Sequence, residues 1–229
     1  MRLPFTRYGL PQVLLYPALI LALMAALALL APRTLWLIPA EILLCLILLW
    51  ALSFFRDPKR VIPLDEAQLL SPADGTITDI SEAEVNGLDG RALRIGVFLS
   101  VFNVHINRSP CSARIESVIY QKGRYKNALS PESSRVNESN AVLMTRLEEP
   151  RDRILVRQVS GAVARRIVCA AKPGREYRQG EPFGMIKFGS RTELYIPLRE
   201  GAYEVRVSLG DTVYAGISPL IAYLKQAPR

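Results

Sequence analysis

The stretch MIKFGSRTELYIP, residues 185–197, decides our view of the fold. Two strand-like runs flank the bare pair Gly189-Ser190, which has no Asn-Gly, Asp-Gly or proline to make a tight turn. The second run alternates apolar residues with others, the period-two pattern of a half-buried strand. We therefore expect extended structure here and a junction selected for something other than turning. The apolar positions of the second run are Leu194, Ile196 and Leu198.

Short alternating runs of the same kind, with turn residues between them, fill much of the rest of the chain. They predict a mainly β (α+β), barrel-like soluble domain over residues 56–229. In the last run, Val205, Val207 and Leu209 are expected on one face of a strand. The other runs are GTITDISEAE (75–84), RALRIGVFLS (91–100), SARIESVIYQ (112–121), NAVLMTRL (140–147) and RILVRQVSG (153–161), and the last is YEVRVSLG (203–210).

Two segments of this domain depart from the strand pattern. Residues 162–171, AVARRIVCAA, are predicted to form a helix, because Gly161 precedes them and Lys-Pro-Gly follows them. Residues 128–140, ALSPESSRVNESN, are polar and rich in serine, which is typical of a mobile loop. We expect this loop to lie near the functional site or the membrane.

The first quarter of the chain differs from the rest in composition. Residues 13–31 contain no charge, and residues 35–55 are interrupted only by one proline and Glu41. Each run is close to the ~20 residues that a helix needs to cross a bilayer core. The sequence predicts a membrane anchor over residues 1–55, a hairpin of two helices at about residues 11–31 and 35–55. A cleavable signal peptide is the competing interpretation of the first run, but its apolar core is shorter than this one.

Basic residues flank the predicted hairpin on both sides. The positive-inside rule then places both ends in the cytoplasm, with the soluble domain on the cytoplasmic side of the cell membrane. A re-entrant hairpin that does not fully cross would leave the same charge pattern. The basic residues are Arg2 and Arg7 before the hairpin, Arg33 between its helices, and Arg56, Lys59 and Arg60 after it.

Charge and cysteine usage exclude several classes of protein. After residue 55 the chain has 26 of its 29 Lys and Arg and 20 of its 21 Asp and Glu, a net charge near +6. This mild excess suits a solvated basic surface or attraction to anionic lipids. Nucleic-acid binding is not predicted, because no recognition motif accompanies the charge. Cys45, Cys111 and Cys169 are isolated, which suits a reducing cytosol and argues against disulfides and a metal site.

Three residues are candidates for chemistry. His105 is the only histidine, so a proton transfer near neutral pH by an unperturbed side chain has this candidate alone, although a lone histidine is more often structural. Asp74 lies in SPADGTI, where an aspartate also serves simply as a turn former. Ser190 follows a glycine, which by itself says little. None of the three would justify a mechanism alone.

Together with their flanking sequence, these residues resemble the phosphatidylserine decarboxylase family in its short, membrane-anchored form. The resemblance covers most of the chain after the hairpin, and several of the matching segments are long. They are FFRDPKRVIP (54–63), LLSPADGTI (69–77), FLSVFNVHINRSP (98–110), VNESN (136–140), QVSGAVARRIVC (158–169), IKFGSRTELYIP (186–197) and LGDTVYAGISPLIA (209–222).

The resemblance implies that the chain cleaves itself. Ser190 would attack the carbonyl of Gly189, with His105 as the base and Asp74 holding that base in the right tautomer. An N-to-O acyl shift followed by β-elimination would split the precursor into a β chain, residues 1–189, and an α chain, residues 190–229. Ser190 would become a pyruvoyl group at the start of the α chain.

The resemblance also implies decarboxylation of phosphatidylserine to phosphatidylethanolamine and CO2. The pyruvoyl group would form a Schiff base with the substrate amine and replace pyridoxal phosphate, and no metal would be needed. The implied partners are a membrane phospholipid and the two chains of one precursor, and a homo-oligomer is left open. His105 is the candidate proton donor in this step. Phe102, Val104 and Ile106 could line an apolar entrance, although packing in the core is the commoner role.

The sequence departs from the family at two positions. Longer members have a second histidine three positions after the first, where this chain has Arg108. Arg108 could pair with the substrate phosphate or carboxylate, or with a surface carboxylate. Ser139 stands in VNESN where the family has arginine, so this segment is assigned no role.

Four alternatives accompany this interpretation. A pyridoxal-phosphate decarboxylase would need a larger fold and a Gly-rich phosphate loop. A non-catalytic, membrane-anchored adaptor of biotinyl- or lipoyl-carrier fold would resemble LGDTVYAGISPLIA, but such carriers need an exposed lysine in a hairpin. A pseudoenzyme would keep the fold without splitting. An archaetidylserine-type ether lipid presents the same headgroup as a glycerol ester lipid and is an alternative substrate.

Overall fold

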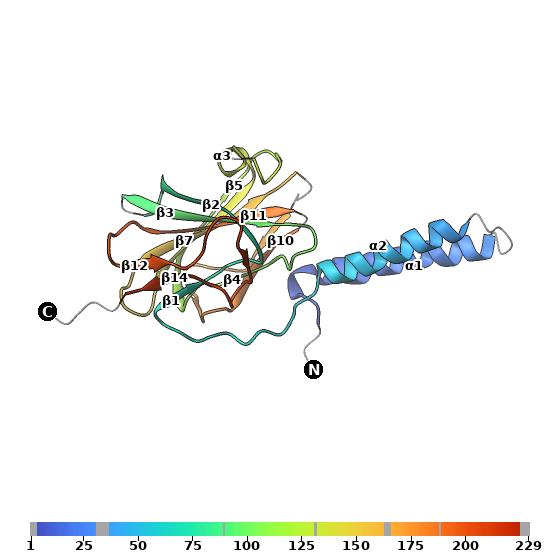
Figure 1. Cartoon of the computed structure of the whole chain (residues 1–229). Helices are drawn as coiled ribbons and strands as arrows, with labels where there is room; N and C mark the ends of the chain where they lie inside the picture. Colours follow the sequence, from blue (N-terminus) through green and yellow to red (C-terminus); the bar gives the residue numbers. More distant parts are fainter. Residues whose placement is uncertain are drawn as a thin grey trace. The chain divides into compact units, whose positions relative to one another are not determined.

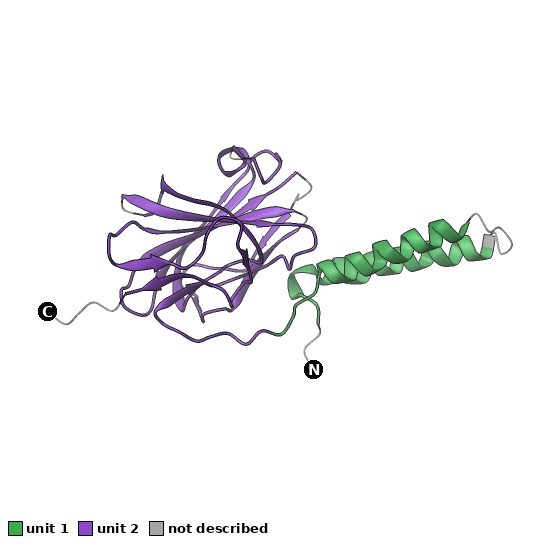
Figure 2. Cartoon of the chain, viewed as in Figure 1, with its two compact units in different colours: residues 1–59 green, residues 60–229 purple. Residues whose placement is uncertain are grey.

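The computed structural model describes residues 4–30, 37–88, 90–130, 132–162, 166–187 and 189–224. The chain forms two compact units, residues 1–59 and residues 60–229, which Figure 2 colours separately. The division between them lies at Lys59 and Arg60, slightly beyond the boundary at residue 55 that the hydropathy pattern predicts.

The first unit consists of apolar helices. A short 3-10 helix, Arg7–Gly9, leads into α1, Leu10–Leu30, and α2 spans Ile38–Phe54 (Figure 1). The stretch Arg7–Leu29 is long and apolar enough to cross a membrane, whereas α2 has only 17 residues. The predicted N-terminal apolar helix is therefore present. The connection between the two helices falls mostly on residues outside the described ranges, and a membrane hairpin of both helices stays a prediction.

The second unit is mostly β structure. Eight antiparallel strands form one sheet, in which the edge strands β13 and β9 do not pair with each other within the described ranges. The sheet is therefore a half-barrel, which confirms in part the mainly β, barrel-like domain that the sequence predicts. In order across the sheet the strands are β13 (Thr212–Val213), β2 (Gly75–Glu84), β3 (Arg91–Leu99), β11 (Ser190–Pro197), β7 (Arg153–Ser160), β6 (Ser139–Arg146), β5 (Ala113–Gln121) and β9 (Glu176–Tyr177).

Two smaller sheets and one short helix accompany this large sheet (Figure 1). The helix, α3, spans Ser133–Val136 inside the serine-rich segment. One three-stranded sheet has the order β1 (Gln68–Leu70), β14 (Pro219–Tyr223), β12 (Tyr203–Val205), and the other has the order β4 (Ile106–Arg108), β10 (Pro182–Lys187), β8 (Arg166–Cys169).

The main hydrophobic core joins the large sheet to β1 and β14. The strands contribute through the alternation that the sequence predicts: in β5, Ala113 and Ile115 are buried while Arg114 and Glu116 are exposed. Burying each large aliphatic side chain contributes about 1.5–3 kcal/mol to folding. The core includes Leu69, Ile77, Ile95, Val97, Ile115, Val156, Leu194, Ile196, Leu220 and Ile221.

Strand β11 lies in the middle of the large sheet, paired with β3 on one side and β7 on the other. All its residues except Pro197 are buried, so the prediction of a half-buried strand was wrong about its polar face. Glu193 is fully buried on that face, where the Arg191 guanidinium and the Tyr195 hydroxyl donate hydrogen bonds to its carboxylate. These bonds offset the cost of removing the charge from water.

Two other local predictions were wrong. Residues 162–171 were predicted to form a helix, but Arg166–Cys169 form the strand β8, because Ile167 and Val168 are β-branched and pair with Ile186 and Met185 of β10. Residues 163–165 of this prediction lie outside the described ranges. The strand predicted at residues 203–210 ends at Val205. Beyond it the chain turns at Gly210, whose φ is +91°, and leaves Leu209 exposed.

The junction between β10 and β11 connects two different sheets. β10 pairs with β4 and β8, whereas β11 begins at Ser190 in the large sheet. Because the chain passes from one sheet to another here, it does not form a hairpin and needs no hairpin turn. This explains why the junction has none of the usual turn residues.

Candidate active site

The Gly189-Ser190 junction has an unusual local geometry. Gly189 has a φ of +61°, in the left-handed region that side chains with a Cβ rarely adopt. Ser190 is fully buried, with Leu99 and Ser160 opposite it on the neighbouring strands. Its Oγ has no hydrogen-bond partner among the residues that the structure describes. A buried hydroxyl that makes no bond is costly, which is a common sign of a functional group.

Gly161 approaches the carbonyl of Gly189 very closely. A Cβ placed on Gly161 would lie 2.3 Å from the Gly189 oxygen and 3.3 Å from the Cβ of Ala128. Only glycine therefore fits beside this carbonyl. From the sequence, Gly161 was predicted only to precede a helix, although a glycine at the end of a strand also indicates close backbone approach.

We expect Gly161→Ala to disturb the Gly189-Ser190 junction and to leave the rest of the fold largely intact. The added methyl must push the Gly189 carbonyl away, a displacement that typically costs about 1–3 kcal/mol. If the junction reacts, the variant should react at least roughly tenfold more slowly, since each 1.4 kcal/mol on a barrier is a factor of ten. A time course of chain splitting on a denaturing gel measures this.

Gly201→Ala is the matched control, because nothing lies within 4 Å of a Cβ at this position. Its φ of +68° makes alanine strained there, so it tests for general loss of stability without crowding the junction. Equal splitting rates in Gly161→Ala and the unmodified chain would show that the close approach has no bearing on the reaction.

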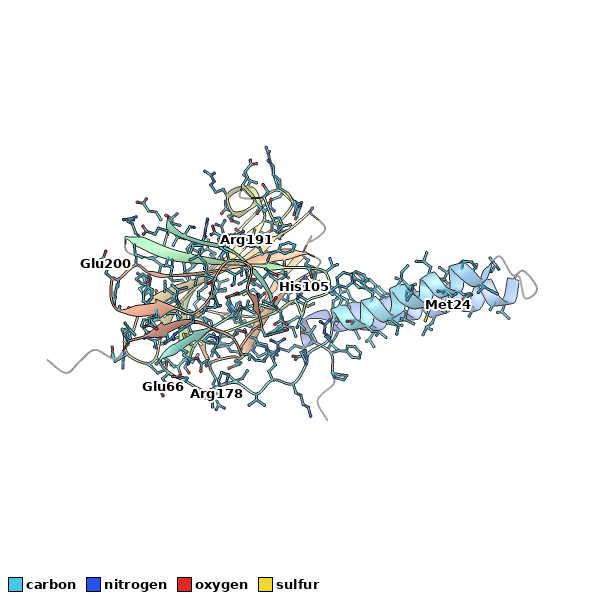
Figure 3. All side chains as sticks on the ribbon, in the orientation of Figure 1. Met24, Glu66, His105, Arg178, Arg191 and Glu200 are labelled. Carbon is cyan, nitrogen blue, oxygen red and sulfur yellow. The ribbon has the colours of Figure 1, made fainter. Side chains whose placement is uncertain are left out.

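His105 is fully buried immediately before β4 and is labelled in Figure 3. Its Nδ1 lies 3.0 Å from the carbonyl oxygen of Asn103. When the neutral ring carries its proton on Nδ1, it donates this bond and Nε2 is the basic nitrogen. The Ile186 N–H donates to the His105 carbonyl at 3.2 Å, which holds the histidine backbone against β10, close in sequence to the junction.

Asp74 is also buried, and its carboxylate is bound by other groups than His105. Arg60 donates two hydrogen bonds to it, both 2.7 Å long, and the Ala215 N–H donates a third at 2.8 Å. In the structure, Asp74 is therefore paired with Arg60, and the Nδ1 of His105 is hydrogen-bonded to the carbonyl oxygen of Asn103. A bidentate buried ion pair of this kind fixes the turn before β2, and orientation of His105 by Asp74 stays a prediction.

The two residues predicted to meet the substrate lie in different surroundings. Arg108 is buried, and its guanidinium donates to the Gly180 carbonyl at 3.0 Å. Phe102 is 72% exposed, whereas Val104 and Ile106 belong to the core. Next to Phe102, Val101 has a methyl group 3.9 Å from the place where a Cβ of Gly189 would be. Of the three residues predicted to line an apolar entrance, Phe102, Val104 and Ile106, only Phe102 is therefore exposed at the surface.

Lys187 is a functional candidate that sequence reasoning missed. It is the last residue of β10, two positions before Gly189, and it is buried. Burial lowers the pKa of its ammonium group, and the nearby positive charge of Arg166 lowers it further. A buried cation beside the junction suits contact with an anionic substrate group. Its apolar neighbours in β10 had suggested only a strand position.

The strand that follows the junction is fixed by buried polar contacts. Arg191, labelled in Figure 3, donates from Nε to the Glu193 carboxylate at 2.9 Å and lies 3.4 Å from Asp79. Its guanidinium occupies the space above Gly96, where a Cβ would lie 2.3 Å from Nη2. The Ser134 hydroxyl of α3 also donates to Glu193. These contacts would keep β11 in place even if the backbone before it were broken.

Other kinds of site find little support in the described ranges. No group of three or more His, Cys, Asp or Glu side chains is arranged there to hold a metal ion. Burial raises the pKa of the Cys111 thiol to about 12 and also raises that of Cys169, so both thiols stay protonated and weakly nucleophilic near neutral pH.

Comparison with known proteins points to one family. A sequence profile described as phosphatidylserine decarboxylase matches residues 47–220. A phosphatidylserine decarboxylase proenzyme of Rhodopirellula baltica is 39% identical over 221 residues, which cover 96% of this chain and 89% of the relative. Proenzymes with the same name from Carboxydothermus hydrogenoformans and Nitrosomonas europaea are 42% and 44% identical. They cover 77% and 74% of this chain, and 81% and 76% of the relatives.

Proposed function

Because the chain belongs to the phosphatidylserine decarboxylase family, we propose that it is made as a precursor and breaks its own backbone between Gly189 and Ser190. Family membership makes it a phosphatidylserine decarboxylase and removes the carrier alternative. Cleavage would give a β chain, residues 1–189, and an α chain, residues 190–229. The name proenzyme, which the three relatives carry, supports a precursor that is processed.

The state of the Ser190 hydroxyl is the observation that carries this proposal. It is buried without a hydrogen-bond partner among the described residues, next to a glycine in the left-handed conformation. An unpaired buried hydroxyl costs about 1–3 kcal/mol. The Ser160 hydroxyl on the neighbouring strand is in the same state, but only Ser190 directly follows a left-handed glycine whose carbonyl it could attack. Gly161 keeps the neighbouring carbonyl uncovered by any side chain at that position.

In the proposed cleavage, His105, Ser190 and Gly189 react in three steps. His105 accepts the proton of Ser190 Oγ as this oxygen bonds to the carbonyl carbon of Gly189, and the proton passes to the nitrogen of Ser190 as the C–N bond breaks. The resulting ester loses the α-proton of Ser190, and Gly189 leaves as a carboxylate. Water then replaces the amino nitrogen of the dehydroalanine, ammonia departs, and a pyruvoyl group remains at position 190.

This pyruvoyl group supplies an electron sink when CO2 leaves an amine-bearing headgroup. The chain's own residues bind and position. Arg191 and Glu193 hold the start of β11 in the sheet, so the new terminus stays where Ser190 was. Lys187 would contact the phosphate or carboxylate of the headgroup. His105 would return a proton to the α-carbon of the headgroup after CO2 has left. Arg108 is a second buried cation for binding the anionic headgroup, and its guanidinium also donates to the Gly180 carbonyl.

We place the enzyme at the cell membrane, with the second unit on the cytoplasmic side. The apolar stretch Arg7–Leu29 supports membrane association. The orientation is supported by basic residues at both ends: Arg2 before this stretch, Arg7 at its start, and Arg56, Lys59 and Arg60 after α2. A membrane location suits the substrate, because a lipid with two acyl chains reaches a bilayer-bound enzyme by lateral diffusion.

Reductive trapping tests the proposed function. The purified protein is incubated with phosphatidylserine labelled in its headgroup, and cyanoborohydride is added. Label is expected on the smaller chain alone, at its first residue, because that residue is the proposed electrophile. Label on a lysine of the larger chain, or on an unsplit polypeptide, would contradict the assignment. A variant with Ser190→Ala should take up no label.

A further inference from the structure

The segment that leads from the end of β5 to α3 exposes apolar and basic side chains together. We call residues 119–135 the basic segment. Four large apolar side chains on it are 43–59% exposed, an unusual number for one short segment. They are Ile119, Tyr120, Tyr125 and Leu129, and the exposed basic residues among them are Lys122, Arg124 and Arg135.

The basic segment is held close to the cleavable junction. The side chain of Asn137 donates to the carbonyls of Lys126 and Ser160, both at 2.8 Å, and accepts from the Lys126 N–H at 2.9 Å. Ser160 lies opposite Ser190 in the large sheet. Ala128 lies next to Gly161, which itself contacts the Gly189 carbonyl.

Another exposed apolar side chain, Phe102, lies on a different loop beside the same junction. Phe102 is 72% exposed, and its neighbour Val101 lies within van der Waals distance of a Cβ placed on Gly189. Leu129, in the basic segment, is 52% exposed and follows Ala128. Phe102 is therefore one position from Val101, which lies beside Gly189, and Leu129 is one position from Ala128, which lies beside Gly161.

The exposed side chains of the basic segment have a net positive charge. Its acidic residue Glu132 pairs with Lys126 at 2.6 Å, and the neighbouring Glu138 is buried. Lys122, Arg124 and Arg135 then remain as an exposed positive group around the apolar side chains. Exposed apolar and aromatic side chains beside basic ones match the interface of an anionic bilayer, where rings and aliphatic groups enter the headgroup layer and cations meet lipid phosphates.

We propose that this face of the second unit docks directly on an anionic bilayer, with Leu129 and Phe102 entering the lipid interface on either side of the junction. Docking brings the substrate headgroup to the site without leaving the membrane. The inference rests on the lipid substrate in the proposed function and is independent of the self-cleavage chemistry. It assigns to the second unit a membrane contact of its own, separate from the apolar helices.

Decarboxylation rates of the full-length protein in vesicles test the docking. Membrane association is not a useful readout, since the N-terminal apolar helix is expected to provide it in every variant. The double variant Tyr125→Asp with Leu129→Asp is compared with the unmodified protein on long-chain phosphatidylserine in vesicles. It is also compared on short-chain phosphatidylserine dispersed as monomers. We expect a loss of kcat/KM of roughly tenfold or more in vesicles, and less than about a twofold change with monomers.

The triple variant Lys122→Gln, Arg124→Gln and Arg135→Gln tests the charges separately. In vesicles of phosphatidylcholine with little phosphatidylserine, the rate of the unmodified protein should rise as phosphatidylglycerol is added, and the triple variant should lose most of this rise. The expected loss is roughly tenfold or more, since each basic residue near an anionic surface is worth about 1 kcal/mol. High salt should abolish the difference.

A matched control changes the opposite end of the β6–β7 hairpin, where Leu147 is 40% exposed and Arg151 pairs with Glu149. Leu147→Asp with Arg151→Gln should leave both rates unchanged. All variants should split completely on a gel, which separates docking from self-cleavage. Equal losses on vesicles and monomers would overturn the proposal, and so would unchanged rates on both. A defect seen only in native membranes would indicate a protein partner instead.

Discussion

Ser190→Ala is expected to leave one unsplit polypeptide and to lower decarboxylation by about 1,000-fold or more, the size of loss typical for removal of a nucleophile. The variant has no Oγ to attack the Gly189 carbonyl, so neither the ester nor the new terminus can form. The fold should persist, because the removed hydroxyl makes no hydrogen bond among the described residues. A denaturing gel and a headgroup-release assay on the same sample measure both effects.

Ser160→Ala is the matched control for this substitution. Ser160 is fully buried directly opposite Ser190, and its hydroxyl is likewise without a partner in the described ranges. Removing it deletes the same atom from the neighbouring strand, and splitting should continue. Decarboxylation by unsplit Ser190→Ala at more than a small fraction of the normal rate would refute the role of Ser190.

His105→Ala is expected to block splitting or slow it by about 100-fold or more, within the range usual for loss of a general base. The neutral ring that donates from Nδ1 to Asn103 presents Nε2 as its basic nitrogen, and no other histidine exists to replace it. The measurement is the fraction of split chain over time after synthesis in a cell-free reaction.

Because His105 is fully buried, its loss could also disturb folding, so rescue is the decisive control. Imidazole added to His105→Ala should restore splitting if the missing group is a base, since the small molecule can occupy the vacated space. Normal splitting without imidazole would remove the base role. Intact, folded protein that stays unsplit at high imidazole would instead assign His105 to positioning.

The strands of the second unit could be predicted because their pattern is local. The run at residues 75–84 has the same bounds as β2. The runs in β3, β5 and β7 differ from the strands by one residue at one end, and the run in β6 differs by one residue at each end. Burial on both faces could not be predicted for β11, because the groups that cover Glu193 come from distant segments such as α3. β8 was missed because its four residues are too few to show a period.

The candidate site divides in the same way between local and distant information. Ser190, His105 and Asp74 stand in long segments that match the family, so their roles are predicted without knowledge of the fold and stay predictions. Arg60, the partner of Asp74, lies 14 residues away in the sequence, so only the structure shows this pair. Gly161 is far from Gly189 in sequence, and its close approach to the Gly189 carbonyl appears only in the folded chain. Lys187 is near Gly189 in sequence, but its burial depends on the packing of the fold.

Intact-mass spectrometry of catalytically competent protein tests cleavage between Gly189 and Ser190. We expect two polypeptides that end and begin at this junction, residues 1–189 and 190–229, with the second lighter by one ammonia than a chain beginning with serine. A single mass for residues 1–229 in material that decarboxylates phosphatidylserine at its full rate would contradict the account.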